Sequence, residues 1–277
     1  LPYRHHIFCN TGDDSEDEGT LKWVRDVLMP YAEQNGIAYS IARKSGKTLY
    51  QTLTTTQYSI PIPAKFHYSN GKKNLGMRSC TTEYKIRVSD RAVKNLYGNR
   101  NDPPIIHVGL GISIDEIQRA KKYPIRRMGS AGEVKTDTQP VYWLKSQEYP
   151  LISSVPFEIF GKQYGKGLTS ADCSQIVRDS GLGDPPKSAC WFCPYHSIAF
   201  WKEHATLDTP IFRDAIKLER IIQDKEPRMK IKQEAEGKVF TEFKVFLTDA
   251  GVSLDRILDT DKGPEYDENC ESGYCMV

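Results

Sequence analysis

One stretch decides the fold: His5-His6-Ile7-Phe8-Cys9-Asn10-Thr11-Gly12-Asp13-Asp14. Its first six residues form a short apolar run and its last four a polar turn, which predicts a buried strand that ends at a turn. A helix should follow and stop at Asn35-Gly36, because apolar residues recur at intervals of three and four: Leu21, Val24, Val27, Leu28 and Tyr31. A second strand is expected over Ile37–Ile41. This order is the βαβ unit of parallel sheets, whose ligands bind beyond the carboxyl ends of the strands.

Length and composition suit one large single-core domain, or one domain with an appendage. The chain has 277 residues, of which 39% are hydrophobic, and a formal net charge of +2, so the overall charge demands neither nucleic acid nor an anionic membrane. No apolar run reaches the roughly 18 residues of a membrane span, and residues 1–6 do not resemble a secretion signal. Seven cysteines in such a chain favour metal ligands or nucleophiles over a disulfide framework. We therefore expect a cytoplasmic protein without a membrane partner.

Later segments continue the α/β pattern. Pro61–Asn74 is predicted to be a loop, and a helix should follow with a buried face made by Val88, Ala92, Val93 and Leu96. Pro104–Gly109 predicts another buried strand, and Pro124–Thr138 an insertion over a site. The C-terminal third is expected to be helical, with a shared face of Phe212, Ala215, Ile216 and Ile222. The final residues, 262–277, are expected to form a tail.

Cysteines carry the strongest chemical signal. Cys190 and Cys193 are separated by two residues, so both thiolates can face one metal from a single turn. Cys173, on a helix expected to run from Ser170 to Ser180-Gly181, and Cys80 are the candidate further ligands. Four sulfur ligands suit a [4Fe–4S] cluster or zinc, and the wide separation of Cys80 is unlike most zinc ribbons. His196 and His204 are the substitute ligands for zinc, and the alternative for any single cysteine, Cys9 above all, is a small buried hydrophobe.

Two other segments predict a nucleotide site. In the turn Thr11–Glu18 a glycine admits a ligand to the backbone, and the acids can hold Mg²⁺ or ribose hydroxyls; the alternative is a solvated helix start. In Gly109–Arg119 the glycines can admit an adenine while Arg119 reaches a phosphate, with further positive charge from Lys121, Lys122, Arg126 and Arg127. The alternative there is a glycine turn before an exposed basic helix.

Two more thiols, Cys270 and Cys275, lie in the acidic terminal segment. An exposed pair can attack a sulfur centre and then form a disulfide, although neighbouring carboxylates raise thiol pKa values and slow the reaction. The alternative is a tail without a chemical role.

Taken in order, these segments resemble the phosphoadenosine phosphosulfate reductase-like family of the adenine nucleotide alpha hydrolase superfamily, from Ile7 to about Trp201. The family's strand with a Thr-Gly-acid turn is similar to Phe8–Asp14, and its Arg-x-Cys-Thr motif to Arg78–Thr81 followed by Lys85. Its Gly-Ile-x-x-x-Glu-x-x-Arg segment is similar to Gly111–Arg119, and its Tyr-Pro-Leu to Tyr149–Leu151. The paired cysteines correspond to Cys190 and Cys193, within a Cys-Trp-Phe-Cys-Pro sequence that looks more like stand-alone members found with mobile elements, phages and CRISPR loci than like assimilatory reductases.

The resemblance implies a doubly wound, mostly parallel sheet in residues 1–152, a helical, cysteine-ligated portion in residues 153–261, and a tail in residues 262–277. It implies that ATP or a related adenine nucleotide, with Mg²⁺, binds at the strand ends, where the matching positions are Phe8, Asn10, Thr11, Gly12, Asp13, Arg78, Gly109, Gly111, Ile112, Glu116, Arg119 and Lys121. The cluster ligands would be Cys80, Cys173, Cys190 and Cys193, and the tail nucleophiles Cys270 and Cys275. The expected partners are the adenine nucleotide, a sulfur-donor protein, and a nucleic acid or defence complex.

Two departures from the family pattern bear on activity. The family's Ser-Gly-Gly-x-Asp/Gln-Ser phosphate loop does not occur here. We expect that about 25 to 30 residues with the first strand precede Leu1; the alternative is that the protein has lost nucleotide hydrolysis. The chain ends Gly-Tyr-Cys-Met-Val, unlike the reductases, which argues against phosphoadenosine phosphosulfate reduction.

The leading hypothesis is therefore an enzyme of sulfur transfer or reduction. Its alternatives are a non-catalytic accessory module with a structural metal site and, less favoured, a zinc-dependent nucleic-acid binder.

Overall fold

The computed structural model describes residues 5–97, 157–159, 162–164 and 168–261. Several sequence predictions lie outside these residues: the strand at 104–109, the glycine segment 109–121, the insertion at 124–138, the boundary at 152/153 and the tail at 262–277. In the part of the chain that is described, the protein is a mixed α/β structure with a small parallel sheet of two strands. No helix in these ranges is long and apolar enough to cross a membrane.

The first strand, helix and second strand confirm the predicted βαβ unit. Strand β1 (His5–Asn10) pairs in parallel with β2 (Ala38–Arg43), with Phe8 opposite Ile41. The connecting helix has three parts, α1 (Glu18–Trp23), the π-helical turn η1 (Val24–Leu28) and α2 (Met29–Gln34), which bury Val24 and Ala32. Helix α2 ends at Gln34 with Asn35 as its C-terminal cap, and Gly36 has the positive φ of 64° that a left-handed stop requires.

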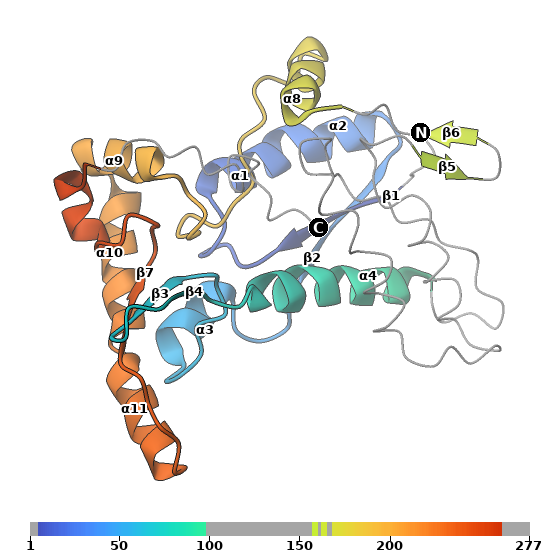
Figure 1. Ribbon diagram of the computed structural model, residues 1–277. Helices are drawn as coiled ribbons and strands as arrows, with labels where there is room; N and C mark the ends of the chain where they lie inside the picture. The colour runs from blue at the N-terminus through green and yellow to red at the C-terminus, as the bar shows by residue number, and fades with distance from the viewer. Residues whose placement is uncertain (1–4, 98–156, 160–161, 165–167, 262–277) are drawn as a thin grey trace.

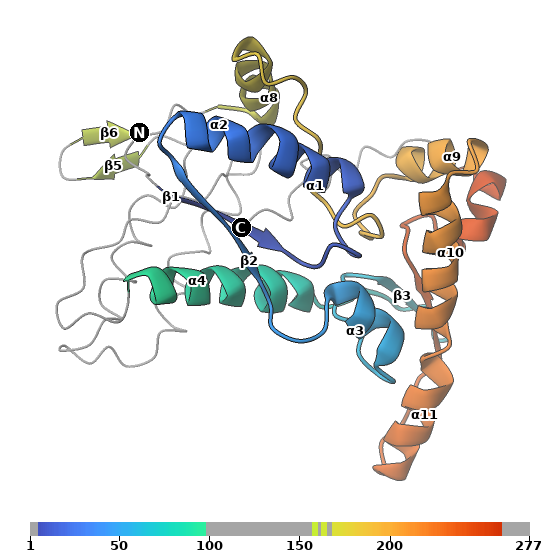
Figure 2. The ribbon, with the colours of Figure 1, turned by 180° about the vertical axis from the view of Figure 1, so that it is seen from behind.

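Helices cover both faces of this strand pair. The α1–α2 segment lies on one side, and α4 (Arg87–Tyr97), which continues the π-helical turn η2 (Thr81–Ile86), lies on the other (Figures 1 and 2). Val88 and Val93 are buried as predicted, whereas Leu96 is exposed. Strands β1 and β2 thus form the centre of a three-layer arrangement.

A second sheet corrects the prediction of a loop over Pro61–Asn74. Strands β3 (Lys65–Tyr68) and β4 (Lys73–Leu75) form a hairpin, and β7 (Phe243–Phe246) pairs with β3, giving the antiparallel order β4-β3-β7. The reason is a partner distant in sequence: Phe66 and Tyr68 pack their rings against Phe243. A separate hairpin joins β5 (Phe157–Ile159) and β6 (Lys162–Tyr164).

The C-terminal part is largely helical, as expected, apart from β7. Its elements are α8 (Ser170–Asp179), α9 (Ile198–Thr206), α10 (Pro210–Gln223), α11 (Glu226–Ala235) and the 3₁₀ turn η4 (Leu254–Asp259). Phe212, Ala215 and Ile222 are buried on α10. A single hydrophobic core contains residues of this part, of α3 (Leu49–Thr55) and of the turn Ala189–Cys193, together with Tyr84. The turn Ala189–Cys193 is called the cysteine turn below.

A buried carboxylate ties α10 to the second sheet. The Oε1 and Oε2 atoms of Glu219 accept hydrogen bonds from the backbone N–H groups of Leu247 (2.8 Å) and Leu254 (2.7 Å). Burial raises the pKa of Glu219 to about 7, and it outweighs the two backbone hydrogen bonds, which favour the charged form.

The free energy of unfolding should therefore depend on pH through Glu219. Below the unfolded-state value of 4.5 the group is protonated in both states, and between 4.5 and about 7 only the folded state holds the proton. Stability from this group is thus fully present at low pH and is lost as the pH rises towards 7, by up to about 3 kcal/mol. We expect urea unfolding between pH 4.5 and 8 to show this loss relative to Glu219→Gln, which cannot titrate. Parallel pH profiles of the two proteins would contradict the assignment.

Candidate functional site

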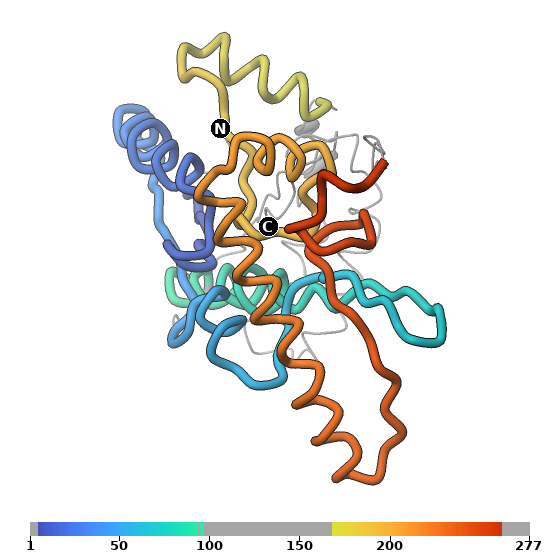
Figure 3. Tube along the Cα trace, turned by 90° about the vertical axis from the view of Figure 1, so that its left-hand side faces the viewer, coloured from blue at the N-terminus to red at the C-terminus, as the bar shows by residue number. Residues whose placement is uncertain are grey.

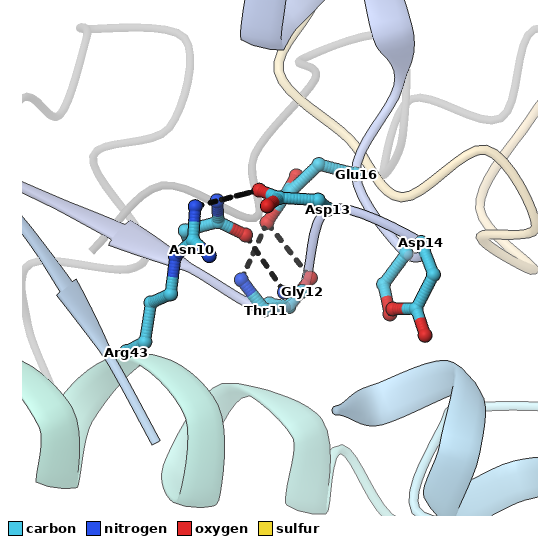
Figure 4. Close-up of polar contacts among 8 residues, drawn as sticks. Asn10, Thr11, Gly12, Asp13, Asp14, Glu16 and Arg43 are labelled. Carbon is cyan, nitrogen blue, oxygen red and sulfur yellow. Dashed lines mark hydrogen bonds and ion pairs between the residues drawn. The ribbon is translucent and has the colours of Figure 1, made fainter. Parts of the chain in front are cut away.

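The turn after β1 is built around Gly12. Its carbonyl accepts hydrogen bonds from the N–H groups of Ser15 and Glu16, both 2.9 Å, and its own N–H donates to Asn10 Oδ1 at 2.7 Å (Figure 4). Gly12 has φ of 138°, and an added Cβ would lie 2.6 Å from Thr48 Cβ. Glycine is therefore required at this position, both for the backbone angle and for the close approach.

Most acids of this turn hold the ends of neighbouring elements together. Asp13 accepts from Asn10 Nδ2 (2.8 Å) and pairs with Arg43 at the end of β2 (2.7 Å) (Figure 4). Asp14 accepts from Thr48 Oγ1 at the start of α3 (2.8 Å). Asp17 caps α1 by accepting from Thr20 N–H at 3.1 Å, so the turn is also a helix start.

Glu16 differs from the other acids because it is buried, with an exposed fraction of 3%. Its Oε1 accepts from both the N–H (3.1 Å) and the hydroxyl (2.8 Å) of Thr11. Its Oε2 is buried without a hydrogen-bond partner in the described part of the chain. A buried carboxylate oxygen without a hydrogen-bond partner is costly, so Glu16 is the acid of the turn most suited to receive a ligand.

The cysteine turn is hydrogen-bonded directly to the turn Thr11–Glu18, called the acidic turn below. Asp17 N–H donates to Ala189 O (3.0 Å), and Trp191 donates from its N–H to Ser15 O (3.2 Å) and from Nε1 to Asp14 O (2.9 Å). These bonds form a short antiparallel bridge between Glu16 and Cys190. Two motifs that lie more than 170 residues apart in the sequence are thereby joined, which neither motif predicts alone.

A hydrogen-bond chain continues from one turn into the other. Thr11 Oγ1 lies 3.4 Å from Cys190 Sγ and 2.8 Å from Glu16 Oε1. An ionised Glu16 can only accept, so the single hydroxyl hydrogen of Thr11 is used on Glu16, and Cys190 must then donate to Thr11. The geometry gives a thiol proton a path from Cys190 through Thr11 to Glu16.

The cysteine turn is braced by its own backbone and by His196. Cys190 O accepts from Cys193 N–H (3.0 Å) and lies 3.0 Å from His196 Nε2. Burial lowers the pKa of His196 to about 4, so the ring is neutral at pH 7 and donates from Nε2. The ring stacks on Phe200, and His204 bonds Thr209 Oγ1 through Nδ1 (2.8 Å). Each predicted substitute ligand therefore has one ring nitrogen engaged.

Three of the four predicted metal ligands are buried in the main hydrophobic core. Cys80, Cys190 and Cys193 are each at most 7% exposed and belong to the same core, together with Phe192 and Trp201. Cys173 lies on α8, is partly exposed and is not part of this core. In the described ranges no three His, Cys, Asp or Glu side chains form a metal-binding group, so the four-cysteine site stays a prediction.

Two of the remaining residues predicted to bind the nucleotide are described by the structure. Phe8 lies in the middle of β1. The Arg78 guanidinium lies 5.0 Å from the centre of the ring of Tyr195, a residue that follows Cys193 by two positions. Cys9 is buried, and burial raises the pKa of its thiol to about 11, which agrees with its interpretation as a small hydrophobe. The other predicted nucleotide-binding residues and the two predicted tail nucleophiles lie outside the described residues: Gly109, Gly111, Ile112, Glu116, Arg119, Lys121, Cys270 and Cys275.

Sequence reasoning gave no separate role to Glu16, Thr48, Arg43 or Trp191. The spacing Thr11-x-x-x-x-Glu16 is a usable signal for Glu16, because a turn of this length returns the side chain to Thr11. The roles of Thr48, Arg43 and Trp191 depend on contacts between distant segments, which leave no local pattern.

Replacing Gly12 by alanine should destabilise the fold more than the same change at Gly46. Both glycines have positive φ, 138° and 84°, but a Cβ at Gly46 would meet no atom within 4 Å. We expect Gly46→Ala to cost about 1 kcal/mol and Gly12→Ala about 1–3 kcal/mol more, measured by urea unfolding. Equal losses would show that the approach to Thr48 does not constrain the turn.

Glu16→Ala should remove the acceptor of both Thr11 donors. We expect a loss of about 1–3 kcal/mol in the free energy of unfolding, because these donors would be left buried. Glu16→Gln keeps an acceptor oxygen and should lose less than Glu16→Ala in the same measurement. Identical stability of wild type and Glu16→Ala would contradict the described role.

Comparison of the chain with models of protein families, with curated proteins and with solved structures finds no match. The residues and contacts described above are therefore the basis on which a function can be assigned to the chain.

Proposed function

We propose that the chain is an adenine-nucleotide-binding enzyme of sulfur transfer or reduction that carries a cysteine-ligated iron–sulfur cluster. One observation supports this above all: the glycine turn at the carboxyl end of a parallel strand is hydrogen-bonded to a Cys-x-x-Cys turn. Strand ends of this kind are the usual place of nucleotides in open α/β sheets, and thiolates are the usual ligands of iron–sulfur clusters. The contact between the two turns supports a function that joins these two chemistries.

The burial of three of the cysteines supports such a cluster, although these thiols would have to draw together to bind it, because they form no metal-binding group in the described ranges. Cys80, Cys190 and Cys193 are buried together in apolar surroundings, which suits soft thiolate ligation. Cys173 on α8 would be the fourth ligand and would have to approach the turn when the cluster binds. A bound cluster would supply a sulfur-binding or electron-donating centre beside the nucleotide.

The protein's own residues would position the nucleotide and move a proton. The nucleotide would bind at the carboxyl end of β1, beside the turn that Gly12 makes possible. Cys190 must lose its proton to become a ligand or nucleophile, and Glu16 is a buried acceptor reached through Thr11. Transfer of that proton keeps the net charge of the buried site unchanged.

A second candidate function is an accessory module whose cysteines serve only to fold the C-terminal part. The observation that favours it is the packing of Cys80, Cys190 and Cys193 within the main hydrophobic core, where thiols can act as small apolar side chains. Pyrophosphate release from ATP by the complete gene product would exclude this candidate. Absence of turnover with any adenine nucleotide would favour it.

The cluster is tested by the metal content of anaerobically purified protein. We expect a brown protein that contains iron and acid-labile sulfide, and the double variant Cys190→Ser/Cys193→Ser should lose both. Cys9→Ser is the matched control, since Cys9 is equally buried but lies on β1, and it should keep the iron. Colourless protein with tightly bound zinc, or iron retained by the double variant, would contradict the proposal.

A further inference from the structure

One face of the antiparallel sheet is basic. Residues paired across antiparallel strands point to the same side, so the register places Lys65, His67, Lys73 and Lys244 on one face. Leu75 and Phe246 share this face, and Phe246 is buried with its ring against His67. The opposite face carries Phe66, Phe243 and Val245, which pack inward, and Gln223 of α10 bonds Val245 O. The basic face is thus the one turned away from α10, and the β3–β4 hairpin projects from the body of the molecule (Figure 3).

Lysines outnumber carboxylates on this face. Lys73 and Lys244 are exposed, as is Lys72 beside them in the hairpin, and none of the three forms an ion pair with a described residue. Lys65 is paired with Asp249 (2.6 Å), and Glu242 at the start of β7 is paired with Lys230 of α11 (2.8 Å). The exposed end of the face therefore keeps a local excess of positive charge, although the net charge of the whole chain is only +2.

Two further cationic side chains, Lys65 and Arg78, lie over the ring of Tyr195 beside the cysteine turn. Lys65 Nζ lies 5.8 Å and the Arg78 guanidinium 5.0 Å from the centre of the Tyr195 ring. Tyr195 follows Cys193 by two residues, so the lysine-bearing strands and the cysteine turn share one border. Two apolar side chains along this border, Leu75 and Met77, are 48% and 79% exposed.

We propose that this face binds single-stranded nucleic acid and leads the strand to the cysteine turn. Lys72, Lys73 and Lys244 would neutralise successive phosphates, while unstacked bases would pack on Leu75, on Met77 and on the Arg78 guanidinium that covers the half-buried Tyr195 ring. A duplex keeps its bases stacked inside and could not use these surfaces. The inference deepens the proposed function by naming the polymer on which the sulfur chemistry would act.

The test is fluorescence anisotropy of a labelled oligothymidylate with the full chain, without ATP or added metal. Lys73→Glu/Lys244→Glu should weaken binding at least about tenfold and reduce the slope of log K against log salt by about 1.4, or roughly 0.7 for each lost phosphate contact. The matched control is Lys22→Glu/Lys217→Glu, which changes the net charge equally at exposed positions on α1 and α10 and should retain binding within about twofold.

Three results would overturn the inference: no binding by wild type, equal weakening by the control pair, or tighter binding of a duplex of the same sequence. If the charge-reversed pair does not fold, Lys73→Gln/Lys244→Gln provides the same comparison with a smaller loss. Ultraviolet crosslinking of the oligothymidylate should label the peptide that contains Tyr195, and a crosslink confined to other peptides would also overturn it. Binding needs neither cluster nor nucleotide, so its failure is distinct from failure of the proposed function.

Discussion

The bridge between the Gly12–Glu16 turn and the Cys190 turn is the constraint on which the rest of the structure depends. Across it, Asp17 N–H donates to Ala189 O and Trp191 N–H donates to Ser15 O, and the Trp191 indole adds a third bond to Asp14 O. Because the acidic turn also fixes the end of β2 through Arg43 and the start of α3 through Thr48, the bridge ties the parallel strands to the C-terminal core. A substitution that displaces one turn is therefore expected to displace the other.

This arrangement gives two buried cysteines, Cys9 and Cys190, different surroundings. Cys9 lies inside β1, where burial raises the pKa of its thiol, and it has the environment of an inert core residue. Cys190 lies at the bridge, with the Thr11 hydroxyl at 3.4 Å and, behind it, the carboxylate of Glu16. A buried thiol with a hydroxyl relay to a buried acid has a route for proton loss that does not need solvent. That difference makes Cys190 the more suitable ligand or nucleophile.

The local patterns in the sequence predicted the parts of the structure that depend on neighbouring residues. The βαβ unit, the stop at Gly36 and the α8 helix followed from periodicity and glycine chemistry. The second sheet did not, because β3 finds its partner in β7 almost 180 residues later and Phe66 gives no local sign of it. The cysteine pair and the glycine turn were recognised separately, but nothing in either motif shows that Trp191 of one and Asp17 of the other form the contact between them.

The most direct measurement is hydrogen exchange of the full chain with and without ATP. If the two turns form one nucleotide-responsive unit, ATP should slow exchange in peptides that contain the acidic turn and, to a similar degree, in those that contain Ala189–Cys193. The amide hydrogens of Asp17 and Trp191, which form the bridge, should be among the most strongly protected. Protection of the acidic turn alone, or no change in either turn, would contradict the account.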